Sequence, residues 1–217
     1  MIESITLSNV LPSVFRDDDS SVRSSQVWLT EMKFCRGTTY LVCAESGTGK
    51  STLLSFIYGN RFDYSGTICF DGKNVRAMSA GDWSRIRCSA LALLPQEMRL
   101  FPELTVMENI EIKNSLTHYK SIDEIRLMLQ ELEIDNKADQ PVARLSLGQQ
   151  QRVALVRTLC QPFDFILMDE PVSHLDARNN AIAARLVERE VKASGAGVIV
   201  TSVGYDMVLD QCVRITL

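Results

Sequence analysis

Long apolar runs are missing from this sequence. No stretch approaches the roughly 18 consecutive apolar residues that a membrane-spanning helix needs. The first residues also lack the charged start and apolar middle of a secretory signal. We therefore expect a soluble protein that stays in the compartment where it is made.

Paired metal-binding cysteines and a surplus of basic charge are missing as well. Six scattered cysteines, none in a C-x-x-C pair, favour free buried thiols in a reducing cytosol over a zinc site or a disulfide framework. A net charge of −4 argues against an obligate nucleic-acid binder, which usually carries a basic patch. At 217 residues the chain is long enough for one α/β domain with a full core.

A short glycine-containing stretch, Ala-Glu-Ser-Gly-Thr-Gly-Lys-Ser-Thr at residues 44–52, lies between two apolar runs. Strand, small-residue loop, Lys-Ser and helix are the context of a phosphate-binding loop. Gly47 and Gly49 let backbone N–H groups turn toward phosphate oxygens at the start of a helix. Lys50 can reach the β- and γ-phosphates, and Ser51 can offer its hydroxyl to Mg²⁺.

The first position of this loop, Ala44, departs from the strict pattern, which has glycine there. One extra methyl group is tolerable if the backbone torsion is an ordinary one. The alternative is a Gly-Thr-Gly turn that merely begins a helix, and this stretch alone leaves that alternative open.

Apolar runs alternate with helix-like patterns along the rest of the chain. Runs that are apolar throughout predict strands buried on both faces of a mainly parallel sheet. Strands are predicted at residues 5–10, 27–34, 40–43, 65–72, 91–96, 165–168, 197–201 and 212–217. Helices are predicted at residues 53–57 and 149–160 and after three capping residues, Thr105, Ser121 (with Glu124) and Asp176.

Two acids, Asp169 and Glu170, directly follow the apolar run at residues 165–168. Parallel α/β sheets bind ligands at the carboxyl ends of their strands, where the glycine-containing loop also lies. We assign Asp169 to the ligand shell of Mg²⁺ and Glu170 to the general base that acts on a water molecule. The alternative is an acidic loop without a catalytic role.

A third constellation, Leu-Ser-Leu-Gly-Gln-Gln-Gln-Arg at residues 145–152, opens a helix. With it the chain resembles the ATPase subunits of ABC transporters, whose signature motif runs Leu-Ser-Gly-Gly-Gln. The resemblance covers the whole chain in order. Residues 44–52 match the Walker A loop, and the family pattern for this loop admits alanine at the first position. Gln96 matches the glutamine loop, residues 165–170 match Walker B, and residues 173–176 match the D-loop. The single-cassette ATPases of the lipoprotein-releasing, macrolide-export and cell-division types are most similar.

This resemblance implies an α/β fold: a P-loop NTPase core with a mainly parallel central sheet, an N-terminal antiparallel β-subdomain and an inserted helical subdomain. We expect a single ATPase domain over residues 1–217. Its core with the β-subdomain would occupy about residues 1–96 and 145–217, and the helical subdomain about residues 97–144.

The resemblance also implies a site shared by two copies of the chain. Each ATP, with Mg²⁺, would be held by the P-loop of one copy and by the signature segment (residues 145–149) of the other. ATP would close this homodimer and hydrolysis would reopen it, which would drive transmembrane permease subunits. The expected location is therefore cytoplasmic, on the cytoplasmic face of the inner membrane, and no nucleic-acid partner is expected.

The residues expected to act form three groups. The catalytic group is Glu170, Gln96, Lys50 and Ser202, and the metal group is Ser51, Gln96 and Asp169. The nucleotide-contacting group is Phe15, Ser46, Gly47, Thr48, Gly49, Lys50, Ser51, Thr52, Ser146, Gly148 and Gln149. Phe15 would stack on adenine, with packing inside its loop as the alternative. Trp28 and Trp83 are expected only to pack.

Two positions depart from the family pattern. Leu147 replaces the first glycine of the signature segment, so its side chain must point away from the nucleotide if Ser146 and Gly148 are to work. The family's histidine after the strand at residues 197–201 is absent, and Ser202 carries no positive charge. Loss of a preorganised donor typically costs about 10²–10³ in rate. We therefore predict slow hydrolysis by the isolated protein.

Two other functions stay open at this stage. An ATP-gated dimerisation switch that regulates a membrane partner with little hydrolysis is favoured by the missing histidine and opposed by Glu170 and Lys50. An ABC protein acting on nucleic acid or ribosomes is opposed by the single cassette, the acidic charge and the lack of a basic arm. The transported substrate is not readable, because in this family specificity lies mainly in the membrane partner.

Overall fold

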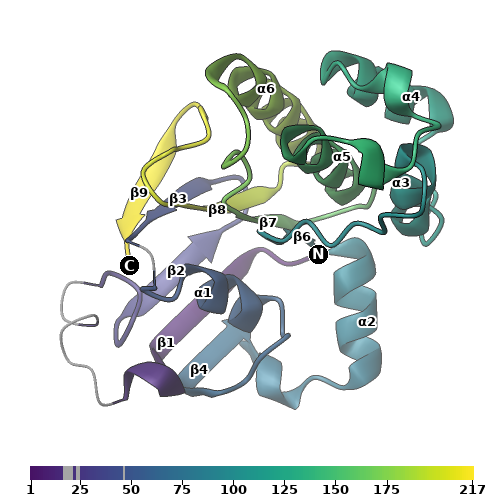
Figure 1. Cartoon of the computed structure of the whole chain (residues 1–217). Helices are drawn as coiled ribbons and strands as arrows, with labels where there is room; N and C mark the ends of the chain where they lie inside the picture. Colours follow the sequence, from purple (N-terminus) through teal and green to yellow (C-terminus); the bar gives the residue numbers. More distant parts are fainter. Residues whose placement is uncertain (17–21, 23–24, 46) are drawn as a thin grey trace.

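Two β-sheets frame the molecule in the computed structural model, which describes residues 1–16, 22, 25–45 and 47–217 (Figure 1). The parallel sheet has the order β6-β7-β8-β3-β9, with β3 (Thr39–Cys43), β6 (Leu91–Leu94), β7 (Phe165–Asp169), β8 (Gly197–Ser202) and β9 (Cys212–Thr216). The antiparallel sheet has the order β2-β1-β4-β5, with β1 (Ser4–Pro12), β2 (Glu31–Cys35), β4 (Tyr64–Phe70) and β5 (Lys73–Asn74). The predicted parallel sheet and antiparallel β-subdomain are confirmed.

Helices cover the parallel sheet on both faces (Figure 1). They are α1 (Lys50–Ile57), α2 (Ala80–Ser89), α3 (Val106–Asn114), α4 (Ile122–Glu131), α5 (Leu147–Leu159) and α6 (Ala177–Ser194). Helices α3 to α6 lie together on one side of the sheet, whereas α1 lies on the side of the antiparallel sheet (Figure 1). The expected helical insert is therefore present, with α3 and α4 as its helices.

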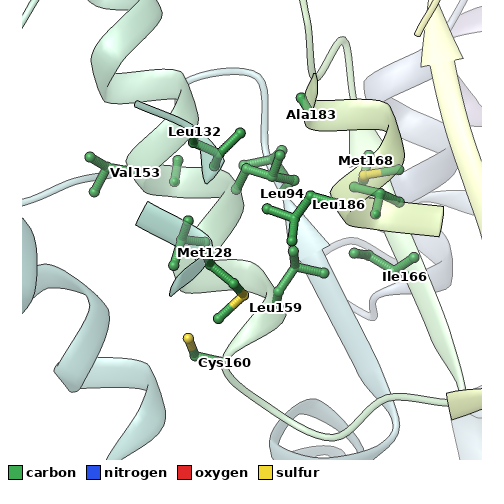
Figure 2. Packing of buried hydrophobic residues seen from close by; sticks show 14 of the residues in the cluster. Leu94, Met128, Leu132, Val153, Leu159, Cys160, Ile166, Met168, Ala183 and Leu186 are labelled. Carbon is green, nitrogen blue, oxygen red and sulfur yellow. The ribbon is translucent and has the colours of Figure 1, made fainter. Parts of the chain in front are cut away.

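The strands of the parallel sheet are apolar throughout because both of their faces are buried. In β7, Ile166 and Met168 pack into one hydrophobic cluster with α5 and α6. Phe165 and Leu167, which point to the opposite face, pack into a second cluster with α1 and the antiparallel sheet. Figure 2 shows the first cluster, with Leu186 of α6 close to the sheet. Burying each such side chain contributes about 1.5–3 kcal/mol to the stability of the fold. The parallel sheet therefore lies between two hydrophobic cores and is stabilised by both.

The sequence-based prediction is wrong at two places. The strand expected at residues 27–34 begins only at Glu31, and Leu29 has a φ of +56°, which a strand does not allow. Trp28 is 1% exposed, so the apolar character of this segment comes from side chains that are buried although the backbone is not a strand. Helix α2 is missing from the prediction, although Ser79 and Asp82 form a capping box at its start.

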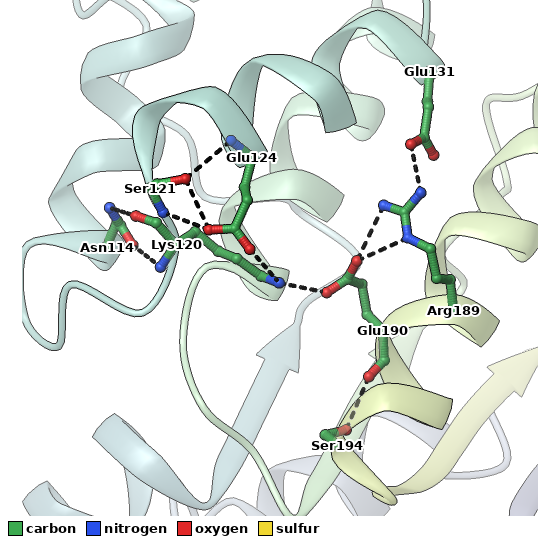
Figure 3. Close-up of polar contacts among 8 residues, drawn as sticks. All are labelled: Asn114, Lys120, Ser121, Glu124, Glu131, Arg189, Glu190 and Ser194. Atoms are coloured by element: carbon green, nitrogen blue, oxygen red, sulfur yellow. Dashed lines mark hydrogen bonds and ion pairs between the residues drawn. The ribbon is translucent and has the colours of Figure 1, made fainter.

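Ion pairs attach α4 to α6 (Figure 3). Lys120, just before α4, lies 2.7 Å from Glu190 of α6, and Glu190 is 8% exposed. Arg189 of α6 pairs with Glu131 at the end of α4 and also with Glu190, at 3.1 Å. Charges that are partly buried are screened less by salt than exposed ones. This network therefore helps to hold the helical insert against the core.

The six cysteines are free thiols, with Cys160 buried and the others half-buried. Within the described ranges, none of the helices has both the length and the apolar composition needed to cross a bilayer.

Acid should weaken the fold through the capping box of α2. The hydroxyl and backbone N–H of Ser79 donate hydrogen bonds to the Asp82 carboxylate, which lowers the pKa of Asp82 to about 2. The folded state thus favours the charged carboxylate, so its contribution is present above the ordinary pKa of 3.8 and is lost as pH falls toward 2. We expect Asp82→Asn to be less stable than wild type at neutral pH but to lose less stability on acidification, as measured by urea unfolding.

The control for this prediction is Asp123→Asn. Asp123 lies in the first turn of α4 and makes no hydrogen bond within the described residues. Its variant should keep the acid dependence of wild type. Equal losses on acidification in wild type and Asp82→Asn would contradict the assignment.

Candidate functional site

The loop between β3 and α1 has the backbone that a phosphate-binding loop requires. Gly47 and Gly49 have φ values of +86° and +99°, which residues with a Cβ rarely adopt. Ala44 is not among the residues with positive φ, so its methyl group causes no backbone strain. Ser46, predicted to contact the nucleotide, lies outside the described residues.

Lys50, the first residue of α1, is folded back over this loop. It is 5% exposed, and its Nζ donates to the carbonyl oxygens of Ala44, at 3.1 Å, and Glu45, at 2.6 Å. The Thr48 hydroxyl also donates to the Glu45 carbonyl, at 2.8 Å. The ammonium group of Lys50 is thus fixed beside the N-terminus of α1. This arrangement suits a polyphosphate, because the positive charge and the helix dipole both attract an anion.

Two aromatic side chains lie against the loop. A Cβ on Gly49 would be 3.0 Å from Cε2 of Phe15 and 3.3 Å from Cζ2 of Trp28. The indole N–H of Trp28 donates to the Thr48 carbonyl at 3.4 Å. The structure therefore places Phe15 beside the phosphate-binding loop, a position compatible with both expectations for it, stacking on adenine and packing inside its loop. The contact of Trp28 with the loop has no signal in the sequence, because it depends on how residues 25–30 fold back.

The three residues predicted to hold the metal line one cavity of about 150 Å³. Ser51 comes from α1, Gln96 follows β6, and Asp169 ends β7. Asp169 is 5% exposed. Hydroxyl, amide and carboxylate oxygens are the hard donors that Mg²⁺ prefers, and Mg²⁺ usually keeps several waters, so this small set fits the ion.

Glu170 directly follows Asp169 and is held from three sides. Its carboxylate accepts a hydrogen bond from Nε2 of Gln96 at 3.2 Å, and its carbonyl accepts one from Nε2 of Gln151 at 3.1 Å. Its backbone N–H donates to Oγ1 of Thr201 at 3.3 Å. The φ of Glu170 is +48°, an unusual conformation for this residue type that these contacts stabilise. The structure thus brings together two of the residues predicted to be catalytic, Gln96 and Glu170.

Thr201 and Gln151 hydrogen-bond to the two predicted acids, and neither residue was predicted from the sequence. The Thr201 hydroxyl donates to Oδ1 of Asp169 at 2.6 Å while it accepts from Glu170, so one buried side chain fixes both acids. Gln151, 2% exposed, also accepts from the His174 backbone N–H at 2.9 Å. Both residues are ordinary in type for a strand and a helix, so only their surroundings identify them.

The signature segment forms the N-terminus of α5. The Ser146 hydroxyl accepts from the Gln149 backbone N–H at 3.3 Å, and the Gln149 side chain accepts from the Ser146 N–H at 2.9 Å. Leu147 is 56% exposed. A Cβ on Gly148 would lie 2.7 Å from the carbonyl oxygen of His174, so this position requires glycine. Leu147 therefore stands at a signature position where packing does not require glycine. At Gly148, by contrast, the local fold does require glycine.

Ser202 is buried at the end of β8. Its hydroxyl donates to Oδ1 of Asp206 at 2.6 Å, and Oδ2 of Asp206 lies 2.9 Å from Nη2 of Arg214. The hydrogen bond to the Asp206 carboxylate raises the pKa of Arg214, so the guanidinium stays charged at neutral pH. The hydroxyl of this predicted catalytic residue is thus directed at a carboxylate of its own chain.

Comparison with known proteins identifies the chain at this point. Residues 30–173 match the sequence pattern of the family described as ABC transporter. The chain belongs to the ABC transporter family. It binds and hydrolyses ATP as the ATP-binding cassette of that family.

Two relatives illustrate the similarity. The lipoprotein-releasing system ATP-binding protein LolD of Buchnera aphidicola subsp. Schizaphis graminum (strain Sg) is 34% identical over 160 residues, which cover 72% of this chain and 69% of LolD. The arabinose import ATP-binding protein AraG of Rhizobium etli is 30% identical over 188 residues, which cover 84% of this chain. This cassette spans 37% of the length of that second relative.

Solved cassettes share the fold. The dimeric structure of MJ0796, a bacterial ABC transporter cassette, superimposes with a TM-score of 0.80 at 23% identity, over 98% of this chain and 94% of that one. A bacterial Atm1-family ABC exporter with ATP bound gives a TM-score of 0.78 at 23% identity, over 100% of this chain and 37% of that one. The parallel sheet, antiparallel sheet and helical insert are thus those of an ABC cassette.

Thr201 should matter for turnover more than for nucleotide binding. Thr201→Val keeps the shape but removes the hydroxyl between Asp169 and Glu170. A hydrogen bond to a charged group is worth about 1.5–3 kcal/mol, so we expect kcat to fall about 10- to 100-fold while ATP binding changes little. Steady-state phosphate release and fluorescent-nucleotide titration measure the two quantities.

Thr158→Val is the matched control for this prediction. Thr158 is also buried, and its hydroxyl donates to the Ala154 carbonyl within α5 at 2.8 Å. This variant should keep its kcat, and Thr201→Ser should recover most of the lost rate. Equal kcat values for Thr201→Val and wild type would show that the hydroxyl does not position the acids.

Proposed function

We propose that this cassette works as a homodimer that encloses two ATP molecules and drives transmembrane permease subunits. The observation that carries the proposal is the separation of two cavities in one chain. Ser51, Gln96 and Asp169 line the first, whereas Ser146, Gly148 and His174 line a second of about 510 Å³, and the two share no residue. We infer that a nucleotide that contacts both sets of residues is held between two copies of the chain.

The predicted site residues around the phosphate-binding loop each have a definite task in this proposal. Lys50 and the N–H groups of residues 47–52 bind the phosphates, and Phe15 stacks on adenine. Glu170 accepts the proton of the attacking water, and Gln96, hydrogen-bonded to Glu170, helps to orient that water. Ser46 stays among the predicted phosphate contacts.

A bound Mg²⁺ ion would supply charge neutralisation at the phosphates. Ser51, Gln96 and Asp169 would hold it, directly or through water, with Asp169 fixed by Thr201. The chain's own contribution is then to keep the acids aligned.

The second copy would supply Ser146, Gly148 and Gln149. The N-terminus of a 13-residue helix offers N–H groups and a favourable dipole to a γ-phosphate. Leu147, being exposed, is free to turn away from the nucleotide. We place the dimer on the cytoplasmic face of the inner membrane, against permease subunits of the lipoprotein-releasing, macrolide-export or cell-division type. The similarity to LolD along 69% of that relative supports this choice.

An ATP-gated dimerisation switch is the second candidate. The contact of Ser202 with Asp206 favours it, because the γ-phosphate then has no donor from the end of β8. The intact arrangement of Lys50, Gln96 and Glu170 favours the hydrolysing motor. The two candidates differ in the fate of the wild-type dimer, which decays with phosphate release in a motor and persists in a switch.

Glu170→Gln should convert the protein into a stable ATP-bound dimer. The amide keeps the size of the side chain but cannot accept the proton of the water, so closed dimers accumulate. We expect gel filtration with ATP and Mg²⁺ to show a dimer for Glu170→Gln. Glu103→Gln, at an exposed acid outside both cavities, should stay monomeric. A monomeric Glu170→Gln variant under these conditions would rule out the enclosed dimer.

Hydrolysis by the isolated cassette should be slow. The missing donor after β8 lowers the rate by about 10²–10³ relative to a site that has one. We expect low phosphate release at protein concentrations where the chain is monomeric, measured with a coupled phosphate assay. Rapid turnover that is unchanged in Ser202→Ala would contradict this expectation.

A further inference from the structure

The backbone of His174 is fixed by contacts with two other segments, whereas its imidazole makes no hydrogen bond within the described residues. Its N–H donates to Oε1 of Gln151 at 2.9 Å, and its carbonyl oxygen lies against Gly148, where a Cβ would be 2.7 Å away. The same Gln151 side chain donates to the Glu170 carbonyl at 3.1 Å. The loop that carries His174 is therefore fixed both to the signature segment and to the acid of its own P-loop cavity.

The imidazole is exposed and lines the cavity of the signature segment together with Ser146. Within the part of the chain that the structure describes, it makes no hydrogen bond or ion pair. Arg152 lines the cavity too, but its Nη1 already donates to the Leu132 carbonyl at 2.6 Å and to Oδ1 of Asn179 at 3.0 Å. Among the side chains of this cavity, the imidazole of His174 thus keeps its full capacity to donate, whereas the Arg152 guanidinium is held by its own chain.

The P-loop cavity lacks such a donor at the end of β8. Ser202 donates to Asp206 at 2.6 Å, and the Arg214 guanidinium is paired with the same carboxylate at 2.9 Å. Hydrolysis builds charge on the γ-phosphate oxygens as the bond to the leaving ADP breaks, and preorganised donors aimed at that charge lower the barrier. The side chains at the end of β8 are therefore occupied within their own chain, whereas the cavity of the signature segment presents an imidazole.

We propose that His174 of one copy donates a hydrogen bond to the γ-phosphate held by the P-loop of the other copy, and so acts as a catalytic residue in trans. This inference rests on the enclosed ATP dimer proposed above. Water oxygen bonds to the γ-phosphorus, the bond from that phosphorus to the oxygen shared with the β-phosphate breaks, and ADP leaves with the electron pair. Glu170 takes the proton of the water, while the imidazole forms no covalent bond and only stabilises charge.

The first test removes the imidazole. His174→Ala should lower kcat about 10²–10³-fold at concentrations where wild type is dimeric. The Glu170→Gln/His174→Ala double variant should still dimerise with ATP and Mg²⁺. His174→Gln, which keeps an N–H donor, should recover part of the rate. His118→Ala changes the other histidine, exposed in the loop before α4, and should turn over like wild type.

The second test asks whether the residue acts across the dimer. Glu170→Gln and His174→Ala should each turn over slowly alone, but a mixed dimer holds one site with both Glu170 and His174 intact. Equal mixing should restore up to roughly a quarter of the wild-type rate, since about half of the dimers are mixed and each has one complete site.

The outcomes separate this inference from the proposed function. Recovered activity on mixing supports action in trans. Dimers without recovered activity, or a His174→Ala variant with the wild-type kcat, overturn the role of His174 and leave the enclosed dimer standing. Absence of ATP-dependent dimers in Glu170→Gln itself overturns the proposed function. Thermal unfolding of His174→Ala and His174→Gln checks that both variants keep the wild-type fold.

Discussion

The buried amide of Gln151 is the interaction on which the geometry of both cavities depends. Its Nε2 donates to the carbonyl of Glu170, and its Oε1 accepts from the N–H of His174. A single side chain from α5 thereby sets the distance between the acid that acts on water and the loop packed against the signature segment. Because the amide is 2% exposed, breaking either hydrogen bond would leave a buried polar group without a partner, so the arrangement is rigid.

Below this contact, the packing of the parallel sheet determines where the chemistry lies. Its strands are buried on both faces, so their carboxyl ends are the places where the chain can turn and leave polar side chains accessible. Ser51 in the first turn of α1, Gln96 after β6 and Asp169 at the end of β7 meet in one cavity at this edge. The ion pairs between α4 and α6 attach the helical insert to the core, because α6 also packs against the parallel sheet.

Local sequence patterns predicted the parts of the fold that local physics controls. The capping boxes at Thr105 and Ser121 start helices as expected, and the uninterrupted apolar runs are strands buried on both faces. The prediction failed where apolar residues are buried without being extended, as around Trp28, and where a helix is short of apolar residues, as in α2. Gly47, Gly49 and Lys50 could be named from spacing, whereas Thr201 and Gln151 could not, because their partners lie 32 and 19 residues away along the chain.

The capping box at the start of α5 has a thermodynamic consequence for ligand binding. A serine hydroxyl has one proton to donate and two lone pairs to accept, and Ser146 uses only a lone pair when it caps the helix. Its proton can therefore turn toward an arriving anion while the cap stays intact. The helix start is a preorganised receptor: no turn of α5 has to melt or form, so no conformational entropy of the backbone is spent when this end of the molecule engages its ligand.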